Sequence, residues 1–145
     1  MPVTFENNWK NIMDKLESVF ETEFKNTLPI YKGSKIPTGI NQALQIIPLE
    51  SNLEDQHTLG ETREYVVNLR FIFNEINVYE TALDHILRQV ERIRALVHDN
   101  ISMTLSDSTR AFNCRLETEI LDADEDSDIY VVSWEWKCLH QQNLS

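Results

Sequence analysis

The sequence predicts an α+β domain in which a four-stranded, mainly antiparallel sheet carries two long helices packed on one face. Three observations lead to this fold class. Two segments repeat apolar residues at helical spacing, others alternate apolar and polar residues as strands do, and the elements follow the order α-β-β-α-β-β. The 145 residues fit a single domain, residues 1–145. Each pair of strands is expected to form an antiparallel hairpin.

The first predicted helix covers residues 5–26, with Thr4 as its expected N-cap. It ends before Pro29, because proline disfavours helical geometry in the residue that precedes it. The apolar stripe that predicts this helix consists of Phe5, Trp9, Ile12, Met13, Leu16, Val19, Phe20 and Phe24.

Two loops and two strands are predicted between the helices. Residues 30–40 hold two of the three glycines of the chain, which is typical of a loop. A short strand at 43–49 follows, and Pro48 indicates that it is an edge strand or that it ends there. The polar residues 51–62 are predicted as a second loop, and 63–73 as a long strand.

The second predicted helix begins at Asn77, which forms a capping-box pattern with Glu80, and its apolar stripe runs to about His98. Two further strands are predicted over 112–120 and 130–139, where apolar and polar residues alternate. In the second of these, the two tryptophans share a face with other apolar residues, so they are expected to be buried against a helix.

An acidic hairpin tip lies between the last two strands. Asp122, Asp124 and Asp126 have the spacing of the first three ligands of an EF-hand calcium loop. However, Ser127 stands where that loop needs glycine and Ser133 where it needs a bidentate glutamate. The tip is therefore interpreted as a solvated turn or as a surface that repels nucleic acid, and no metal site is assigned.

The composition excludes several function classes. With 24 acidic and 13 basic residues the net charge is −11, which argues against DNA as a ligand because phosphates attract Lys and Arg. Three glycines are too few for a dinucleotide fold, and two cysteines cannot build a disulfide scaffold or a four-thiolate zinc site. No segment approaches the ~20 apolar residues of a membrane span. The N-terminus lacks the basic region and apolar run of a signal peptide, so secretion by a cleaved signal peptide is not expected.

The register expected for the last hairpin bears on the cysteines. A hairpin centred on the acidic tip places Cys114 opposite Trp136 and Cys138 opposite Phe112. The two α-carbons then lie on a diagonal, roughly 7–8 Å apart, at or beyond the disulfide limit of about 6.8 Å. Both cysteines are predicted to be reduced thiols in the core.

No catalytic pattern is visible. Gly33-Ser34-Lys35 lacks the spacing and the preceding strand of a phosphate loop, and there is no nucleophile elbow. The four histidines are scattered without the spacing of a metal site: His57, His85, His98 and His140. The sequence therefore predicts no enzyme activity, no catalytic residue, no metal and no cofactor.

A ladder of alternating charge lies on the second helix, where Asp84, Arg88 and Arg92 follow one another at four-residue spacing. Such a ladder is usually a solvated helix face. In an oligomer the same arginines could pair with carboxylates of a neighbouring copy, so Arg88 and Arg92 are the candidate subunit-interface residues.

Six segments together carry a family resemblance. They are an amphipathic N-terminal helix with Trp9, the Pro/Gly loop Lys32-Gly33-Ser34-Lys35-Ile36-Pro37, a short strand ending Ile46-Ile47-Pro48, a long strand announced by Thr62-Arg63-Glu64-Tyr65-Val66-Val67-Asn68-Leu69, a long helix, and a last hairpin ending Val132-Ser133-Trp134-Glu135-Trp136-Lys137-Cys138. In these segments the chain resembles, over nearly its whole length, the tail terminator (tail completion) proteins of long-tailed bacteriophages and the related tail-to-head joining proteins.

The resemblance implies a structural virion protein that forms a ring, typically a hexamer, on top of the tail tube. Such a ring stops tube polymerisation and joins the tail to the neck and head, and DNA passes through its central channel without specific binding. The implied partners are further copies of the chain, the tail tube protein, the neck or connector proteins and, in contractile tails, the sheath. The implied location is the neck–tail junction of a virion assembled in the bacterial cytoplasm, without a membrane.

The acidic charge is compatible with a channel that DNA must traverse without sticking. The candidate channel-lining residues are Asp122, Asp124, Glu125, Asp126 and Asp128, with Glu117 and Glu119 as an alternative. Candidate contacts with the tube or neck lie in the two long loops and include Lys32, Lys35, Glu54 and Asp55. Two other functions stay open, namely a neck connector or head completion protein of the same fold and a small cytoplasmic ligand-binding or enzymatic domain.

Overall fold

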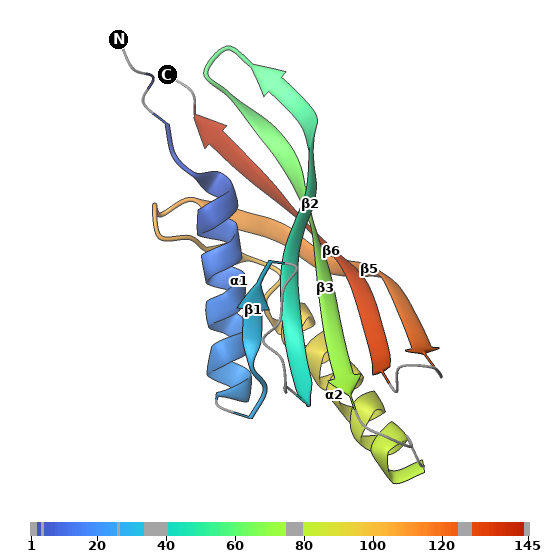
Figure 1. Ribbon diagram of the computed structural model, residues 1–145. Coiled ribbons are helices and arrows are strands. Elements are labelled where there is room, and N and C mark those ends of the chain that lie inside the picture. Colours follow the sequence, from blue (N-terminus) through green and yellow to red (C-terminus); the bar gives the residue numbers. More distant parts are fainter. Residues whose placement is uncertain are drawn as a thin grey trace.

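The computed structural model describes residues 3, 5–25, 27–33, 41–74, 80–124 and 129–143. Two helices and six strands lie within these residues (Figure 1). In chain order they are α1 (Asn8–Phe24), β1 (Ile30–Lys32), β2 (Gln42–His57), β3 (Gly60–Asn74), α2 (Glu80–Asp99), β4 (Met103–Thr104), β5 (Arg110–Asp124) and β6 (Ile129–Asn143).

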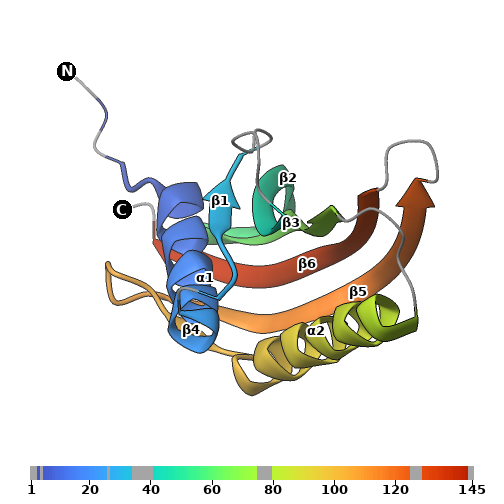
Figure 2. The same ribbon diagram turned by 60° about the horizontal axis from the view of Figure 1, so that its bottom comes forward.

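The sheet has six strands, mixed directions and a marked curl, so the predicted fold class is wrong. The strand order is β1-β2-β3-β6-β5-β4. β1 pairs with β2 in parallel, and every other pair is antiparallel. Figure 2 shows how strongly β5 and β6 bend, with α2 running alongside β5. The prediction of a four-stranded sheet under two helices missed β1 and β4 because strands of three and two residues are too short to show alternation.

The helices and the sheet share one hydrophobic core. Its largest side chains are Trp134 and Trp136 of β6, each 1% exposed, which confirms the expectation that both are buried. They are flanked by the odd-numbered residues of β3 that the alternation placed on one face. The helices contribute Ile12, Met13, Leu16, Phe20 and Phe24 from α1 and Ile86, Val90, Ile93 and Val97 from α2.

The helix boundaries differ at the N-terminus of α1. The helix begins at Asn8, and Asn7 is its N-cap, since the Asn7 side chain accepts a hydrogen bond of 3.1 Å from the backbone N–H of Lys10. Phe5 lies before the helix with its side chain 77% exposed. Thr4 and Asn77, the predicted caps, lie outside the described residues. α2 ends at Asp99, one residue beyond the predicted His98.

The polar residues 51–62, predicted as a loop, belong mostly to two long strands. β2 continues to His57 and β3 starts at Gly60, so only Thr58 and Leu59 form the turn. β2 passes Pro48 in a β-bulge instead of ending there. This stretch lacks apolar alternation because neither of its faces meets the core, and the backbone ladder alone defines it.

The register of the last hairpin also differs from the expectation. Leu116 pairs with Trp136, and Phe112 pairs with Leu139, because two bulges in β5 shift the pairing. Cys114 lies in the first bulge and is buried, as is Cys138, and both are free thiols. A hydrogen bond with Cys114 and burial both raise the pKa of the Cys138 thiol, so it stays protonated.

The β2–β3 turn and the N-terminal end of α2 lie at opposite ends of the molecule (Figure 1). The turn between β2 and β3 lies at one end, together with the residues before α1 and the end of β6. The side chain of Asn8 at the start of α1 donates a hydrogen bond to Gln142 near the end of β6, which ties these two segments together. The N-terminal end of α2 lies at the opposite end.

Candidate assembly surfaces

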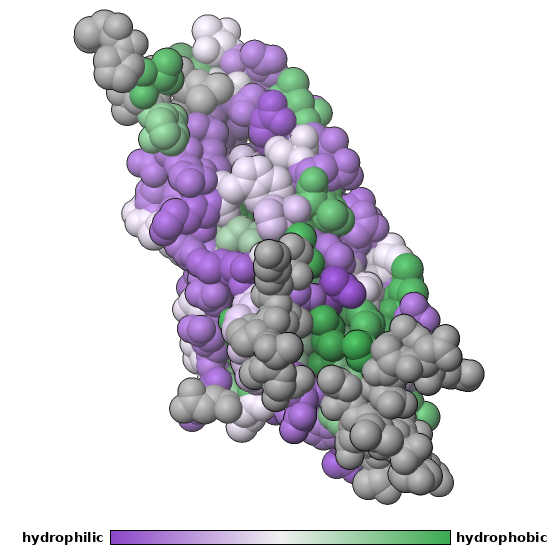
Figure 3. Space-filling model, viewed as in Figure 1, coloured by the Kyte–Doolittle hydropathy of each residue, from purple (hydrophilic) through white to green (hydrophobic). Residues whose placement is uncertain are grey.

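A long and largely exposed part of the sheet is residues 49–64 of the β2–β3 hairpin, here called the arm. The only buried residue of the arm is Gly60. Leu49, Leu53 and Leu59 are 54%, 48% and 61% exposed, although leucine is mostly found inside proteins. Figure 3 shows several separate hydrophobic spots on this face of the molecule, surrounded by hydrophilic side chains. The arm adds nothing to the core, which makes it a candidate contact surface.

The charged side chains on the β2 side of the arm are all acidic. Glu50, Glu54 and Asp55 are exposed, and none of them forms an ion pair within the described residues. On the β3 side, Arg63 is held by Glu61 at 2.8 Å, and Glu64 by Arg115 at 3.1 Å. The β2 edge therefore presents uncompensated negative charge beside leucine side chains.

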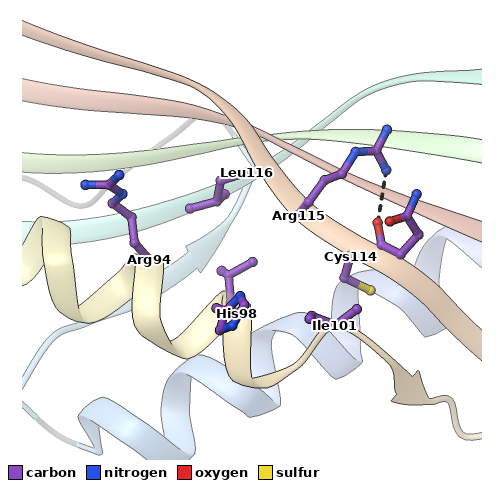
Figure 4. A pocket seen from close by; sticks show the side chains of 8 residues that line it. Arg94, His98, Ile101, Cys114, Arg115 and Leu116 are labelled. Carbon is purple, nitrogen blue, oxygen red and sulfur yellow. Dashed lines mark hydrogen bonds between the residues drawn. The ribbon is translucent and has the colours of Figure 1, made fainter.

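A groove lies between the C-terminal half of α2 and β5, with a volume of about 290 Å³. Its lining includes Arg94 and His98 of α2, Ile101 after α2, and Cys114, Arg115 and Leu116 of β5, and the Arg115 side chain points away from α2 (Figure 4). No carboxylate lines this groove, here called the bulge groove, but Arg94 contacts Glu91 at 2.7 Å and Glu119 at 3.7 Å beside it. Among the apolar members, Ile101 keeps 47% of its side chain exposed.

The first bulge of β5 shapes the groove. Asn113 has φ +53°, a left-handed conformation that asparagine tolerates better than most residues. The bulge turns Cys114 toward the core, and its backbone N–H donates 2.8 Å to the carbonyl of Ile101. The guanidinium of Arg115 donates to the Asn113 carbonyl at 3.0 Å, the dashed line in Figure 4. The wall of the groove is thus fixed by hydrogen bonds.

A cluster of charged side chains fixes Arg115 on the face of the sheet opposite the helices. Arg115 contacts Glu64 at 3.1 Å and Glu117 at 2.8 Å, and Lys137 contacts Glu117 at 2.9 Å. Hydrogen bonds from Lys137 and then Arg115 lower the pKa of the Glu117 carboxyl. The hydrogen bond to Glu117 raises the pKa of Lys137. These charges neutralise one another, which leaves Glu117 a poor candidate for repelling DNA.

The acidic hairpin tip is described only in part. Asp122 is exposed on β5, and Asp124 is the last residue of that strand. Glu125, Asp126 and Asp128 lie outside the described residues. Glu119, the other alternative lining residue, accepts a hydrogen bond of 2.7 Å from the indole N–H of Trp134.

The candidate interface arginines differ in their surroundings. Arg88 pairs only with Asp84 of its own helix within the described residues, and its side chain is 80% exposed. Arg92 instead bridges to α1. Its Nε lies 2.8 Å from Glu23, its Nη2 donates 3.1 Å to the carbonyl of Glu23, and its guanidinium lies 4.5 Å from the centroid of the Phe24 ring. Arg92 thus joins the two helices within one copy of the chain.

The candidate contact residues of the two predicted loops are spread over the fold. Lys32 is on β1 and pairs with Asp14 of α1 at 2.6 Å. That hydrogen bond raises the pKa of the Lys32 ammonium. Lys35 lies outside the described residues. Glu54 and Asp55 lie on the arm, so the structure separates them from Lys32 instead of gathering one contact patch.

One buried polar cluster has the residue types of a catalytic site but not the access. The hydroxyl of Thr109 donates to Asp107 and lies 2.8 Å from Nε2 of His140. His140 is 1% exposed, and burial lowers the pKa of its imidazole, with Asp107 opposing the shift. A substrate could not reach this ring, so the cluster serves to hold the β4–β5 turn against β6.

No group of three or more His, Cys, Asp or Glu side chains among the described residues is arranged to hold a metal ion. No described helix is long and apolar enough to cross a membrane.

Comparison with known proteins finds likeness at the level of fold. No family model matches the sequence, and no curated protein matches it. Among solved structures, the fold is similar to that of a chain in the virion of a native gene transfer agent particle, with a TM-score of 0.53 and 9% sequence identity. The match covers 92% of this chain and 93% of that chain, so the two proteins share the fold from end to end.

Proposed function

We propose that this chain is a structural virion protein, a tail terminator that forms a ring on the tail tube of a phage-like particle. The observation that carries the proposal is the fold match to a virion chain over 92% of this chain and 93% of that chain. The family resemblance of the sequence points the same way. The proposed partners are other copies of this chain, the tube protein, the neck proteins and, in a contractile tail, the sheath.

Two open strand edges support assembly. β1 covers β2 only at Ile30–Lys32, and β4 covers β5 only at Met103–Thr104. Within the described residues, the outer edges of 47–57 in β2 and 115–124 in β5 therefore have no ladder partner. Long unpaired edges invite pairing with another chain. When one surface binds a different surface of the next copy, the contact closes into a ring if its rotation permits.

Tail length tests the proposed role. Particles produced without this protein are expected to carry overlong tail tubes, because nothing stops polymerisation. Electron micrographs of the lysate measure the length distribution. Tubes of normal length that lack heads would contradict the terminator role and assign the chain to the neck connector. In the same lysate, a variant with residues 51–62 of the arm replaced by a two-residue turn should fold, by circular dichroism, and leave tubes uncapped.

Within the ring, we assign the acidic end of the β5–β6 hairpin to the DNA channel. Asp122 is the residue to substitute in a test, because it is exposed and forms no ion pair within the described residues. Asp122→Lys is expected to slow DNA release from particles while leaving rings intact, since a cation in the channel attracts phosphates. Glu21→Lys on α1 is the matched control, because it changes the net charge equally at another exposed site. Equal release rates for both variants would remove Asp122 from the channel.

A further inference from the structure

We propose that Cys114 and Cys138 form a modification site, at which hydrogen peroxide joins the two thiols in a disulfide within one copy of the chain. The two residues lie on neighbouring strands, β5 and β6, and both belong to the hydrophobic core. In the structure both are free thiols. The modification does not depend on the proposed function, because only these two side chains and a small oxidant take part.

The register of the β5–β6 hairpin places the two cysteines across from each other. The strand pairs on either side of the first β5 bulge leave two residues, Asn113 and Cys114, opposite the single residue Cys138 of β6. Asn113 is exposed and Cys114 is buried, so it is Cys114 that lies on the core side of the sheet with Cys138. The register that the sequence predicts would have set the two cysteines on a diagonal, and the observed register removes that offset.

The separation of opposed residues suits a disulfide. Residues opposite each other on antiparallel strands have α-carbons about 4.5–5.5 Å apart, and disulfides usually join α-carbons about 4.4–6.8 Å apart. The two side chains already contact each other, since a hydrogen bond links the thiols of Cys114 and Cys138. The backbone of Cys114 is fixed there, because its N–H donates to the carbonyl of Ile101 at 2.8 Å. The bond can therefore form without a shift of either strand.

The two thiols differ in their access to an oxidant. Cys114 lines the bulge groove and is 3% exposed, whereas Cys138 is 0% exposed (Figure 4). The hydrogen bond with Cys114 and burial raise the pKa of the Cys138 thiol, which makes it a poor nucleophile. Hydrogen peroxide is little larger than water, so it suits a thiol of such low exposure. Cys114 therefore reacts first and Cys138 second.

The reaction takes two balanced steps. The Cys114 sulfur attacks one oxygen of hydrogen peroxide, the O–O bond breaks, and the thiol proton leaves with the other oxygen as water, which gives a sulfenic acid on Cys114. The Cys138 sulfur then attacks the Cys114 sulfur, the S–O bond breaks, and the departing hydroxyl takes the Cys138 proton to form a second water. Both sulfurs are oxidised, and one peroxide is reduced to two waters.

The disulfide would tie the β5 wall of the bulge groove to the core strand β6. It closes a loop across the hairpin and so restricts the unfolded chain, which is expected to raise the midpoint of thermal unfolding by about 5–10 °C. In the proposed role, the chain is made in a reducing cytoplasm and meets an oxidising medium only after release. The thiols would then persist during assembly, and the bond would form in the finished particle.

Peptide mapping tests the site directly. The reduced protein is treated with hydrogen peroxide, its remaining thiols are blocked with iodoacetamide, and it is digested with trypsin without a reductant. Trypsin cleaves after Arg110, Arg115 and Lys137, so the two cysteines lie in separate peptides, 111–115 and 138–145. Mass spectrometry is expected to find these peptides joined, in a chain that runs at 17.0 kDa on a denaturing gel without reductant. Separate peptides, or a bond found only between copies, would overturn the proposal.

One variant of each cysteine tests the order of the two steps. Cys138→Ala removes the second thiol, so the sulfenic acid on Cys114 should persist and be captured by dimedone, which reacts with sulfenic acids. Cys114→Ala should take up roughly a tenth of that amount or less, because the remaining thiol is buried and protonated. Circular dichroism checks that each variant is folded. Equal capture by the two variants would overturn the assignment of Cys114 as the thiol that meets the oxidant.

Thermal unfolding of the wild type gives a readout that needs no substitution. The midpoint should rise after peroxide treatment and return when dithiothreitol reduces the bond. Cys138→Ala is the control for methionine oxidation, because it keeps every methionine and should show neither change. A midpoint that stays the same or falls when the bond forms would overturn the proposal, since the disulfide would not fit the native fold. The tail-length experiment is unaffected by either result, so the two proposals fail separately.

Discussion

Replacing Trp134 with alanine is expected to lower the free energy of unfolding by about 3–5 kcal/mol. The indole is 1% exposed in the middle of β6, and its removal leaves a cavity that the surrounding strands cannot fill. The change also removes the 2.7 Å hydrogen bond to Glu119, whose carboxylate keeps its contact of 3.7 Å with Arg94. Urea titration followed by circular dichroism, at one fixed protein concentration, measures the loss.

The neighbouring residue Ile120 is the control for this experiment. Ile120 lies on β5, next to Glu119, and its side chain is 58% exposed. Ile120→Ala should change the free energy of unfolding by less than about 0.5 kcal/mol, as most surface substitutions do. Trp134→Phe should fall between the two, because it keeps an aromatic ring and removes the indole N–H. A Trp134→Ala variant as stable as Ile120→Ala would show that β6 is not at the centre of the core.

Arg92→Ala is expected to destabilise the protein by about 1–2 kcal/mol, the combined size of a partly exposed ion pair and a cation–π contact. The guanidinium also donates to the carbonyl of Glu23, in the last turn of α1, where backbone carbonyls lack helical partners. The same side chain therefore holds the end of α1 and covers the Phe24 ring. Thermal unfolding at low and high salt separates the contributions, since salt weakens only the ionic part.

Arg88→Ala provides the matched comparison for Arg92→Ala. Both arginines are one helical turn apart on α2, but Arg88 pairs only with Asp84 within the described residues and is 80% exposed. Its loss should cost about 0.2–0.5 kcal/mol. Equal effects of the two substitutions would show that the bridge to α1 contributes nothing to stability. If Arg88 matters for assembly instead, its substitution will change the oligomer mass and not the unfolding curve.

Elements that meet the core could be predicted from the sequence, and those that do not could not. The stripe of α1 and the alternation around Trp134 and Trp136 were recognisable because burial on one face imposes a period on the sequence. The arm has no buried face, so its residues carried no period and were predicted as a loop. β1 and β4 were missed for another reason, because strands of three and two residues are too short to alternate.

The position of the groove could not be predicted either, because it depends on a bulge. Nothing in the sequence around Asn113 distinguishes a bulge from a regular strand, and the expected register placed Cys114 opposite Trp136 in a regular ladder. In the structure Leu116 pairs with Trp136, and the bulge between Phe112 and Arg115 forms the β5 wall of the groove. By contrast, the ladder of Asp84, Arg88 and Arg92 was visible as spacing. The sequence did not show that Arg88 is solvated whereas Arg92 bridges the two helices, because this depends on where α1 lies.

The bulge at Leu49 has a consequence for how the arm can change. Leu49 is an extra residue between the pairs Pro48–Val67 and Glu50–Val66. If Leu49 instead entered the ladder opposite Val66, Leu53 would pair with Thr62 and lie on the opposite face of the sheet. Deleting Leu49 would therefore keep the present pairs, whereas closing the bulge without a deletion would turn over every side chain from Glu50 as far as Leu53. The bulge therefore decides on which face of the arm each side chain lies, independently of the residues that hold the domain together.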